Sequence, residues 1–322
     1  MSDLYGAIDL GGTNVRAIVA DLDGEIRGDQ IQSSRASEGL DAALEAIEGA
    51  MHLAGEEALV KVADLRAIGI ASAGWLDAKE GIVVAAPQLP GWHNVPLCRI
   101  LQERLGPPAH LENDANAAAL GENVFGAGQG VQHMIYITVS TGVGGGIIID
   151  GKLYGGARGS AGEIGHMVID DGGPPCGCGN RGCLEALASG TAISRRGTEA
   201  EAAGESGALT AILQRDGRIS AQAMSAAAAY GDSVSREIFA EAGRYLGIGL
   251  GNLINVFSPE AILIGGGVSR AGDLFMPHAE KSMQSIALSE PLKYAKLGFA
   301  QLGDMAGPLG MIARLREIAA GS

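Results

Sequence analysis

Two segments of this chain repeat one pattern, and the repeat restricts the fold more than any other feature. Residues 7–26 read AIDLGGTNVRAIVADLDGEI, and residues 135–153 read IYITVSTGVGGGIIIDGKL. Each segment has an apolar strand, a turn of glycine and threonine, a second strand of β-branched residues, and an Asp-Gly pair typical of a hairpin turn. An internal duplication of this kind predicts two related halves, each built on a hairpin with a glycine turn.

The remaining pattern predicts an α/β fold of two lobes that meet at a central cleft, because strands alternate with helices and no low-complexity linker intervenes. We expect a smaller lobe over 1–112, completed by a C-terminal helix at about 305–322, and a larger lobe over 113–304. Strands are predicted at 65–71, 82–86 and 261–264, and helices at 39–54, 115–122, 195–218, 220–231, 233–257 and 308–319. Residues 87–96 are expected to form a loop, and Asp114 is expected to cap the helix that follows it.

Three of the four cysteines lie in one short segment rich in glycine and proline, close to a histidine. Zinc prefers four tetrahedral nitrogen and sulfur ligands in structural sites, and this segment offers His166, Cys176, Cys178 and Cys183. Because protein ligands fill all four positions, we predict a structural zinc without an open place for catalytic water. A disulfide or a group of free thiols is the alternative. The fourth cysteine, Cys98, is predicted to be a small buried apolar residue.

The net charge of −14, from 23 basic and 37 acidic residues, argues against binding nucleic acid through a basic face. The first eight residues lack the features of a signal peptide, and no apolar run reaches the roughly 18–20 residues that a membrane helix requires. We therefore expect a cytoplasmic protein with no nucleic-acid or membrane partner.

Three glycine-rich turns follow apolar strands: Gly11-Gly12-Thr13, Thr141–Gly146 and Gly265–Gly267. Each by itself is compatible with an ordinary tight turn. Together, with two of them in matching hairpins, they favour a bound nucleotide, because a turn without Cβ atoms lets backbone N–H groups approach phosphate oxygens. Asp9 lies beside the first turn and would repel phosphate unless a cation such as Mg²⁺ lay between them. A solvated aspartate at a strand end is the alternative.

Three further carboxylates are candidate functional groups. Asp114 could accept the proton of an attacking hydroxyl, as a general base in phosphoryl transfer, and we expect the helix N-terminus to hold it ionised. Alternatively it serves only as a helix cap. Glu163 and Glu185 flank the metal ligands, so that with His166 they could bind sugar hydroxyls, or they could merely support the ligands or face solvent.

The chain resembles the ROK family of sugar kinases and repressors over nearly its whole length. The resemblance rests on Asp9–Thr13, Glu112–Asn116, Ser140–Gly146, the Gly-Glu-Ile-Gly-His run at 162–166, the cysteine segment 176–185 and Gly265–Gly267. The glycine turns are shared with actin-like ATPases in general, whereas the Gly-Glu-x-Gly-His run with the cysteines is far more specific. The resemblance implies an actin-like, ribonuclease-H-like duplicated fold, and transfer of the ATP γ-phosphoryl group to a sugar hydroxyl with Mg²⁺ and a structural Zn²⁺.

The resemblance also implies roles for individual residues. Asp114 matches the catalytic base of the family. The positions that match sugar contacts are Gly74, Asn113, Asp114, Glu163, His166 and Glu185. The nucleotide is expected at Asp9, Gly11, Gly12, Thr13, Asn14, Thr141 and Gly142, with Gly265, Gly266 and Gly267 near the adenosine.

Two departures from the family pattern concern the substrate. Ala73-Gly74 stands where many relatives have Pro-Gly, and Gln88 stands where many have Asn in a loop near the sugar. We predict a glucokinase that makes glucose 6-phosphate, and a homodimer. The alternatives are an N-acetylglucosamine or N-acetylmannosamine kinase and, more distantly, a sugar-sensing repressor. Such a repressor needs a DNA-binding module before the first glycine turn, and eight residues cannot supply one.

Overall fold

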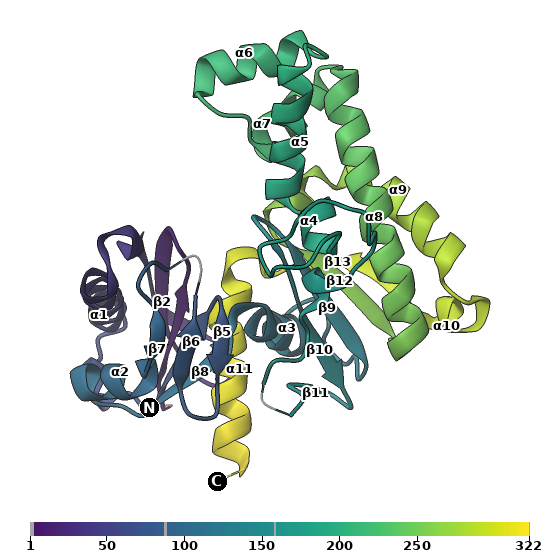
Figure 1. Cartoon of the computed structure of the whole chain (residues 1–322). Coiled ribbons are helices and arrows are strands. Elements are labelled where there is room, and N and C mark those ends of the chain that lie inside the picture. The colour runs from purple at the N-terminus through teal and green to yellow at the C-terminus, as the bar shows by residue number, and fades with distance from the viewer. Residues whose placement is uncertain (1–2, 87–88, 158, 322) are drawn as a thin grey trace. The chain divides into compact units, whose positions relative to one another are not determined.

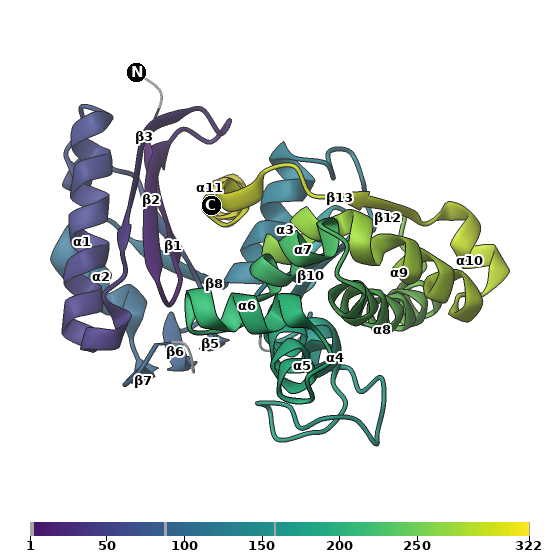
Figure 2. The same ribbon diagram turned by 90° about the horizontal axis from the view of Figure 1, so that it is seen from above.

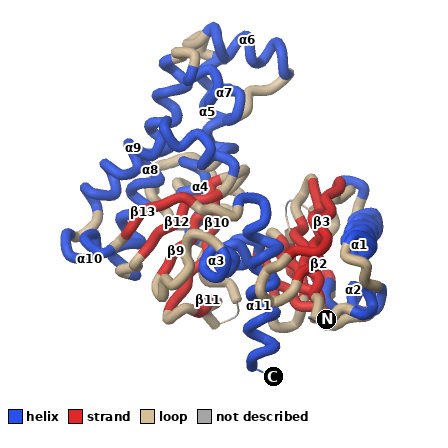
Figure 3. The backbone as a smooth tube through the Cα atoms, turned by 180° about the vertical axis from the view of Figure 1, so that it is seen from behind, coloured by secondary structure: helices blue, strands red, loops and turns tan. Residues whose placement is uncertain are grey.

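The computed structural model describes residues 3–86, 89–157 and 159–321. The chain divides into two compact units. Unit 1 comprises residues 1–136, 146–162 and 300–322, and unit 2 comprises residues 137–145 and 163–299. Figure 1 follows the chain from its N-terminus to its C-terminus, and Figure 3 marks the strands in red.

Two five-stranded sheets share one strand order. The first has the order β3-β2-β1-β4-β8, with antiparallel pairing of β1, β2 and β3 and parallel pairing of β4 with β1 and β8. The second has the order β11-β10-β9-β12-β13, which is the same arrangement of third, second, first, fourth and fifth strand. The matching order confirms the duplicated α/β fold that the repeated hairpin pattern predicted.

The strands of the two hairpins, β4 and β12 lie close to predicted segments, whereas β3, β8 and β13 were not predicted. In the first sheet they are β1 (Tyr5–Leu10), β2 (Asn14–Ala20), β3 (Ile26–Ser33), β4 (Ile68–Ser72) and β8 (Ala109–Asn113). In the second they are β9 (Met134–Val139), β10 (Val143–Ile149), β11 (Lys152–Leu153), β12 (Ala261–Gly265) and β13 (Lys296–Phe299). Asp150 and Gly151 between β10 and β11 have φ values of 53° and 70°. Positive φ at both central residues is the geometry of a type I′ hairpin turn, as the Asp-Gly pair predicted.

A small antiparallel sheet corrects the prediction of a loop over 87–96. It consists of β5 (Trp75–Asp77), β6 (Ile82–Ala85) and β7 (His93–Val95), and β7 pairs with β6 through Val83 with Val95 and Ala85 with His93. Three residues, two of them polar and exposed, are too few to show an alternating pattern in the sequence.

Helices cover both faces of the first sheet (Figure 2). One face packs on α1 (Leu40–Glu57) and α2 (Leu97–Leu105) through buried Leu, Ile, Val, Met and Ala side chains. The other packs on α11 (Ala306–Gly321), which also lies against α3 (Asp114–Phe125). A Cβ at Gly310 would lie 1.7 Å from the carbonyl oxygen of Ala117. Glycine at 310 therefore lets the backbones of α11 and α3 approach closely.

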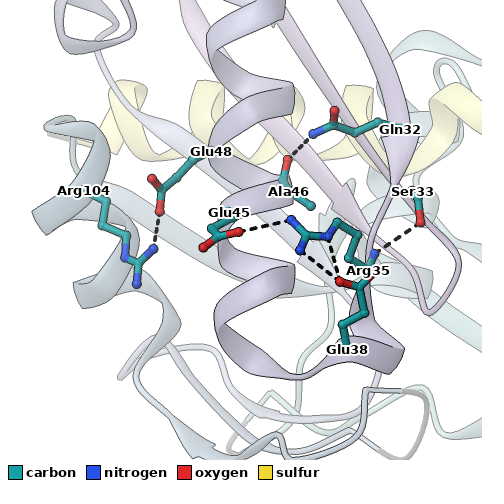
Figure 4. Close-up of polar contacts among 8 residues, drawn as sticks. All are labelled: Gln32, Ser33, Arg35, Glu38, Glu45, Ala46, Glu48 and Arg104. Atoms are coloured by element: carbon teal, nitrogen blue, oxygen red, sulfur yellow. Dashed lines mark hydrogen bonds and ion pairs between the residues drawn. The ribbon is translucent and has the colours of Figure 1, made fainter.

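Ion pairs on the outer side of α1 join it to its neighbours (Figure 4). The Arg35 guanidinium reaches Glu38 and Glu45, and Arg104 of α2 reaches Glu48. Arg35 and both of its partners are exposed, and pairs of that kind stabilise a fold by only about 0–1 kcal/mol each. The buried apolar cluster, rather than these pairs, holds α1 on the sheet.

Helices dominate unit 2. They are α4 (Leu184–Ala188), α5 (Gly190–Ala202), α6 (Gly207–Asp216), α7 (Ala221–Ala229), α8 (Ser233–Phe257), α9 (Gly272–Ile286) and α10 (Ser289–Tyr294). Helix α8 matches the predicted segment, whereas α9 and α10 were not predicted. Pro277 lies inside α9, and a proline within an apolar pattern usually indicates a break. Over the part of the chain that the structure describes, no helix is long and apolar enough to cross a membrane.

Candidate functional site

The first sheet brings two predicted aspartates to one of its edges. Asp9 lies near the end of β1, and Asp114 follows β8 directly. Both strands run parallel to β4, which lies between them, so their carboxyl ends meet at the same edge. Ligands of open α/β sheets bind at this edge. Gly74, which follows β4, has a φ of 112°. A Cβ at Gly74 would lie 2.5 Å from the Ala85 carbonyl oxygen, so no other residue fits there without a shift.

Asp9 is in an environment that disfavours its negative charge. Burial, then the charges of Asp114 and Asp304, raise its pKa from 3.8 to about 7, although the nearby Arg16 acts in the opposite direction. Arg16 is itself paired with Asp29 at 2.5 Å, so its charge is largely engaged elsewhere. A divalent cation at this point would relieve the repulsion among the carboxylates, which fits the predicted Mg²⁺.

Asp114 differs in two respects from the expectation. The helix cap is Asn113, whose side-chain oxygen accepts hydrogen bonds from the backbone N–H groups of Ala115 at 2.9 Å and Asn116 at 3.2 Å. Asp114 is therefore the first helical residue, and its side chain is not needed as a cap. Burial raises the pKa of Asp114, and the hydrogen bonds from Ala115 and Asn113 oppose that effect only in part. Desolvation therefore outweighs the favourable effect of the helix end on the pKa of Asp114.

A buried carboxylate that sequence reasoning missed supports this helix end. Glu112 Oε1 accepts hydrogen bonds from the Asn113 backbone N–H and from Asn116 Nδ2, both at 3.1 Å. Glu112 is 5% exposed, and burial raises the pKa of its carboxyl group. The residues on both sides of Asp114 are therefore held by Glu112.

A second missed feature is the segment before α11. Asp304 lies close enough to raise the pKa of Asp9 by its charge. A Cβ at Gly307 would lie 3.1 Å from the Asp9 carboxyl carbon. The start of α11 therefore borders the Asp9 carboxylate, and no predicted motif pointed to it.

The glycine turns are held by backbone contacts. Gly11 N–H donates to the Asn14 carbonyl at 3.0 Å, and Gly12, Thr13 and Asn14 are exposed. In the second turn, Ser140 N–H donates to the Gly142 carbonyl at 2.9 Å, and the Thr141 carbonyl accepts from Thr191 Oγ1 at 2.8 Å. Thr191 lies at the start of α5, so the N-terminus of that helix packs on the turn.

The third turn, Gly265–Gly267, ends β12 and begins a 3₁₀ helix over Gly267–Ala271. Gly266 has a φ of 87°, and a Cβ there would lie 2.5 Å from the Val139 carbonyl oxygen. Glycine is therefore required at 266 both by the backbone conformation and by the approach of β9.

The four predicted metal ligands converge. One donor atom from each of His166, Cys176, Cys178 and Cys183 lies within 4.8 Å of the others. Cys176 Sγ is 3.6 Å from His166 Nδ1, and Cys178 Sγ is 3.7 Å from Cys183 Sγ. Zinc–ligand distances of about 2.3 Å to sulfur and about 2.0–2.1 Å to nitrogen require roughly 3.8 Å between two sulfurs and roughly 3.6 Å between sulfur and nitrogen at tetrahedral corners. All four cysteines of the chain are free thiols, so the disulfide alternative is not formed.

Two glutamates lie beside this cluster. Glu163 Oε2 is 3.9 Å from His166 Nε2, the ring nitrogen opposite to the one that faces Cys176. Glu185 Oε2 accepts a hydrogen bond from Val143 N–H at 3.0 Å, and its Oε1 is 3.9 Å from Cys176 Sγ. Glu185 therefore connects the cysteine cluster to the second glycine turn.

The sequence also singled out Gln88, in a loop expected near the sugar, and Cys98, expected to be a small buried apolar residue. Gln88 lies outside the described residues. Cys98 is partly buried against the apolar cluster of unit 1, as expected of a small apolar residue, and burial raises the pKa of its thiol to about 12.

Comparison with known proteins identifies relatives over nearly the whole chain. The profile of the ROK family matches residues 5–317. The glucokinase of Halalkalibacterium halodurans is 36% identical over 314 residues, which is 96% of this chain and 94% of that protein. A crystal structure of a ROK family glucokinase from Streptomyces griseus, in complex with glucose and AMPPNP, superposes with a TM-score of 0.83 at 38% identity and covers 98% of this chain and 99% of that one. The xylose repressor of Caldicellulosiruptor bescii is 33% identical over 306 residues, which is 95% of this chain but 76% of the repressor.

Proposed function

The chain belongs to the ROK family and has its actin-like duplicated α/β fold, and on this premise we propose that it transfers the γ-phosphoryl group of ATP to the 6-hydroxyl of glucose. The observation that carries the proposal is the pair Asp9 and Asp114 at one sheet edge, each with a raised pKa. One carboxylate suits a cation that accompanies phosphate, and the other suits a base that accepts the sugar proton. The relatives named above as glucokinases support glucose as the sugar.

Asp114 is the proposed general base. A general base works best when its pKa lies near the working pH, and burial shifts the pKa of Asp114 upward from that of a solvated aspartate. Glu112 and Asn113 hold the residues beside it in place, so the carboxylate keeps its direction toward the sugar hydroxyl. In the reaction the 6-hydroxyl oxygen attacks the γ-phosphorus, its proton passes to Asp114, and the bond from the γ-phosphorus to the ADP oxygen breaks.

The donor side is proposed to use Asp9 and the glycine turns. Asp9 would hold Mg²⁺, which when bound neutralises charge on the β- and γ-phosphates. The turn Gly11, Gly12, Thr13, Asn14 and the turn Thr141, Gly142 would offer backbone N–H groups to phosphate oxygens. Gly265, Gly266 and Gly267 would lie at the adenosine.

The sugar side is proposed to use the polar groups that match sugar contacts of the family. The Asn113 oxygen caps α3 and its side-chain amide bonds to Asp114, so one of the two amide N–H groups would remain to donate to the sugar. His166 Nε2, Glu163 and Glu185 would bind sugar hydroxyls, and Gly74 would leave room for the ring. Glu185 also accepts a hydrogen bond from Val143 N–H beside the second glycine turn.

The cysteine cluster is proposed to hold one structural Zn²⁺. The sulfur–sulfur and sulfur–nitrogen separations match tetrahedral corners, and burial raises the pKa of Cys183 to about 12, so a thiolate there needs a cation beside it. His166 would bind zinc through Nδ1, which leaves Nε2 directed toward Glu163. The zinc would thereby fix the orientation of a sugar ligand.

A coupled ADP-release assay tests the proposal. MgATP is supplied with glucose, N-acetylglucosamine, N-acetylmannosamine, mannose or fructose in parallel. We expect the highest kcat/KM with glucose. A preference for an N-acetylated sugar would keep the chemistry but replace the substrate, and an absence of turnover with every sugar would overturn the kinase assignment.

A further inference from the structure

Glu122 is a fully buried carboxylate that has no place in the chemistry above. It lies in the last turn of α3 and is 0% exposed. Its Oε2 accepts a hydrogen bond from Ala127 N–H at 2.9 Å, just beyond the helix. Its Oε1 accepts from Leu302 N–H at 2.7 Å, and both oxygens accept from Gln301 N–H, at 2.9 and 3.1 Å.

These bonds fasten two segments that lie about 180 residues apart in sequence. Three backbone N–H donors converge on this one side chain, and each bond would leave a buried donor unsatisfied if it were lost. Buried acidic side chains are rare unless they are well paired. Glu122 therefore holds the chain at residues 301 and 302 through several hydrogen bonds to one buried side chain.

The fastened segment leads directly to the proposed donor site. Gln301 and Leu302 precede the 3₁₀ helix Gly303–Met305 and the start of α11. Asp304 in that 3₁₀ helix acts on Asp9 and Arg16 by its charge, and Gly307 borders the Asp9 carboxylate. Glu122 and Asp114 belong to one helix, so a single rigid element carries the proposed base at one end and this anchor at the other.

We propose that Glu122 is a positioning residue for the phosphate donor: it holds the segment 301–307 so that Asp304 and the start of α11 complete the MgATP site around Asp9. The inference rests on the proposed function. It assigns Asp304 to the surroundings of the cation that Asp9 would hold, because Asp304 lies in the turn just before Gly307, which borders the Asp9 carboxylate. Groups of this kind, which support a ligand without replacing it, typically change metal affinity by about 10–100-fold when removed.

The test uses the isosteric variant Glu122→Gln. Both oxygens of Glu122 accept backbone N–H bonds, so the amide NH₂ group of glutamine must face at least one of those donors, whichever way it turns. Asp304→Asn is the second variant, and because Asp304 is exposed this change should not endanger folding. Ile312→Val is the matched control, since it removes one methylene from the buried face of α11 without touching the segment 301–307.

We measure KM for MgATP, KM for glucose, kcat, and the affinity for Mg·AMPPNP by calorimetry. Glu122→Gln and Asp304→Asn should each raise KM for MgATP and weaken Mg·AMPPNP binding by about tenfold. KM for glucose should stay within about twofold, because the donor contacts alone are lost. Ile312→Val should leave all these constants unchanged even though it lowers thermal stability.

The opposite pattern overturns the inference. If Glu122→Gln lowers thermal stability as Ile312→Val does but leaves donor affinity unchanged, Glu122 is only structural. If Asp304→Asn leaves donor affinity unchanged, the segment does not belong to the donor site. Failure of the proposed function is distinguishable, because the wild-type protein itself would then show neither sugar phosphorylation nor Mg·AMPPNP binding.

Discussion

Replacing Asp9 by asparagine should stabilise the ligand-free protein, and increasingly so as the pH rises. The pKa of Asp9 is about 7 in the folded protein and 3.8 without the fold. Between these values the folded state retains a proton that the unfolded state has lost, so stability falls as the pH rises through this window. From about pH 5 to about pH 8.5 the loss amounts to about 3 kcal/mol. The Asp9→Asn variant has no carboxyl group at this position and should not show this loss of stability.

The assay is urea denaturation of wild type and Asp9→Asn at both pH values without Mg²⁺ or nucleotide. Effects of the substitution that do not depend on pH cancel when the two differences are subtracted. Asp41→Asn is the matched control, because Asp41 is an exposed aspartate in the first turn of α1. The stability gain of Asp9→Asn should be larger at the higher pH by about 3 kcal/mol, and that of Asp41→Asn should hardly vary. An equal gain at both pH values would refute the reasoning, because Asp9 would then be ionised at no cost to the fold.

Four further outcomes are expected. Asp114→Asn should fold normally and lower kcat by about 10²–10⁴ in the coupled assay, whereas near-normal turnover would exclude it as the base. The purified protein should contain about one zinc per chain by elemental analysis, and Cys178→Ser should lose it; an active wild-type protein without metal would contradict the site. Gly310→Ala should lower the free energy of unfolding by at least about 2 kcal/mol, because its methyl would meet the Ala117 carbonyl, while Gly207→Ala, which meets no atom, should not. Light scattering should show a dimer at micromolar concentration, and a monomer would end that expectation.

The sequence predicted the features that depend on local pattern. Spacing and residue type within short segments were enough to predict the duplicated hairpin, the long helix α8 and the convergence of His166 with three cysteines. The exact cap of α3 does not follow. Asn113 and Asp114 are equally good helix caps, so only the structure shows that Asn113 caps α3 and that Asp114 does not.

Features that depend on distant segments escaped prediction. The pKa of Asp114 rises because it is buried, and burial is set by what packs on the helix end rather than by the helix itself. Glu122 and Asp304 gave no signal either, because Glu122 bonds to backbone groups that every residue carries, from a segment about 180 residues away. A sequence pattern reflects side chains alone, whereas the groups that bind Glu122 are backbone N–H donors.

The packing of α11 on the first sheet has a consequence for synthesis on the ribosome. The face formed by β1 and β4 is covered by a helix that is translated roughly 300 residues after β1. At about 5–20 residues per second, this apolar surface stays open for about 15–60 s while the rest of the chain emerges. During that interval chaperones can bind the exposed apolar surface of the nascent chain. Slower translation should therefore favour aggregation of this protein, unlike proteins whose domains close behind the ribosome as they appear.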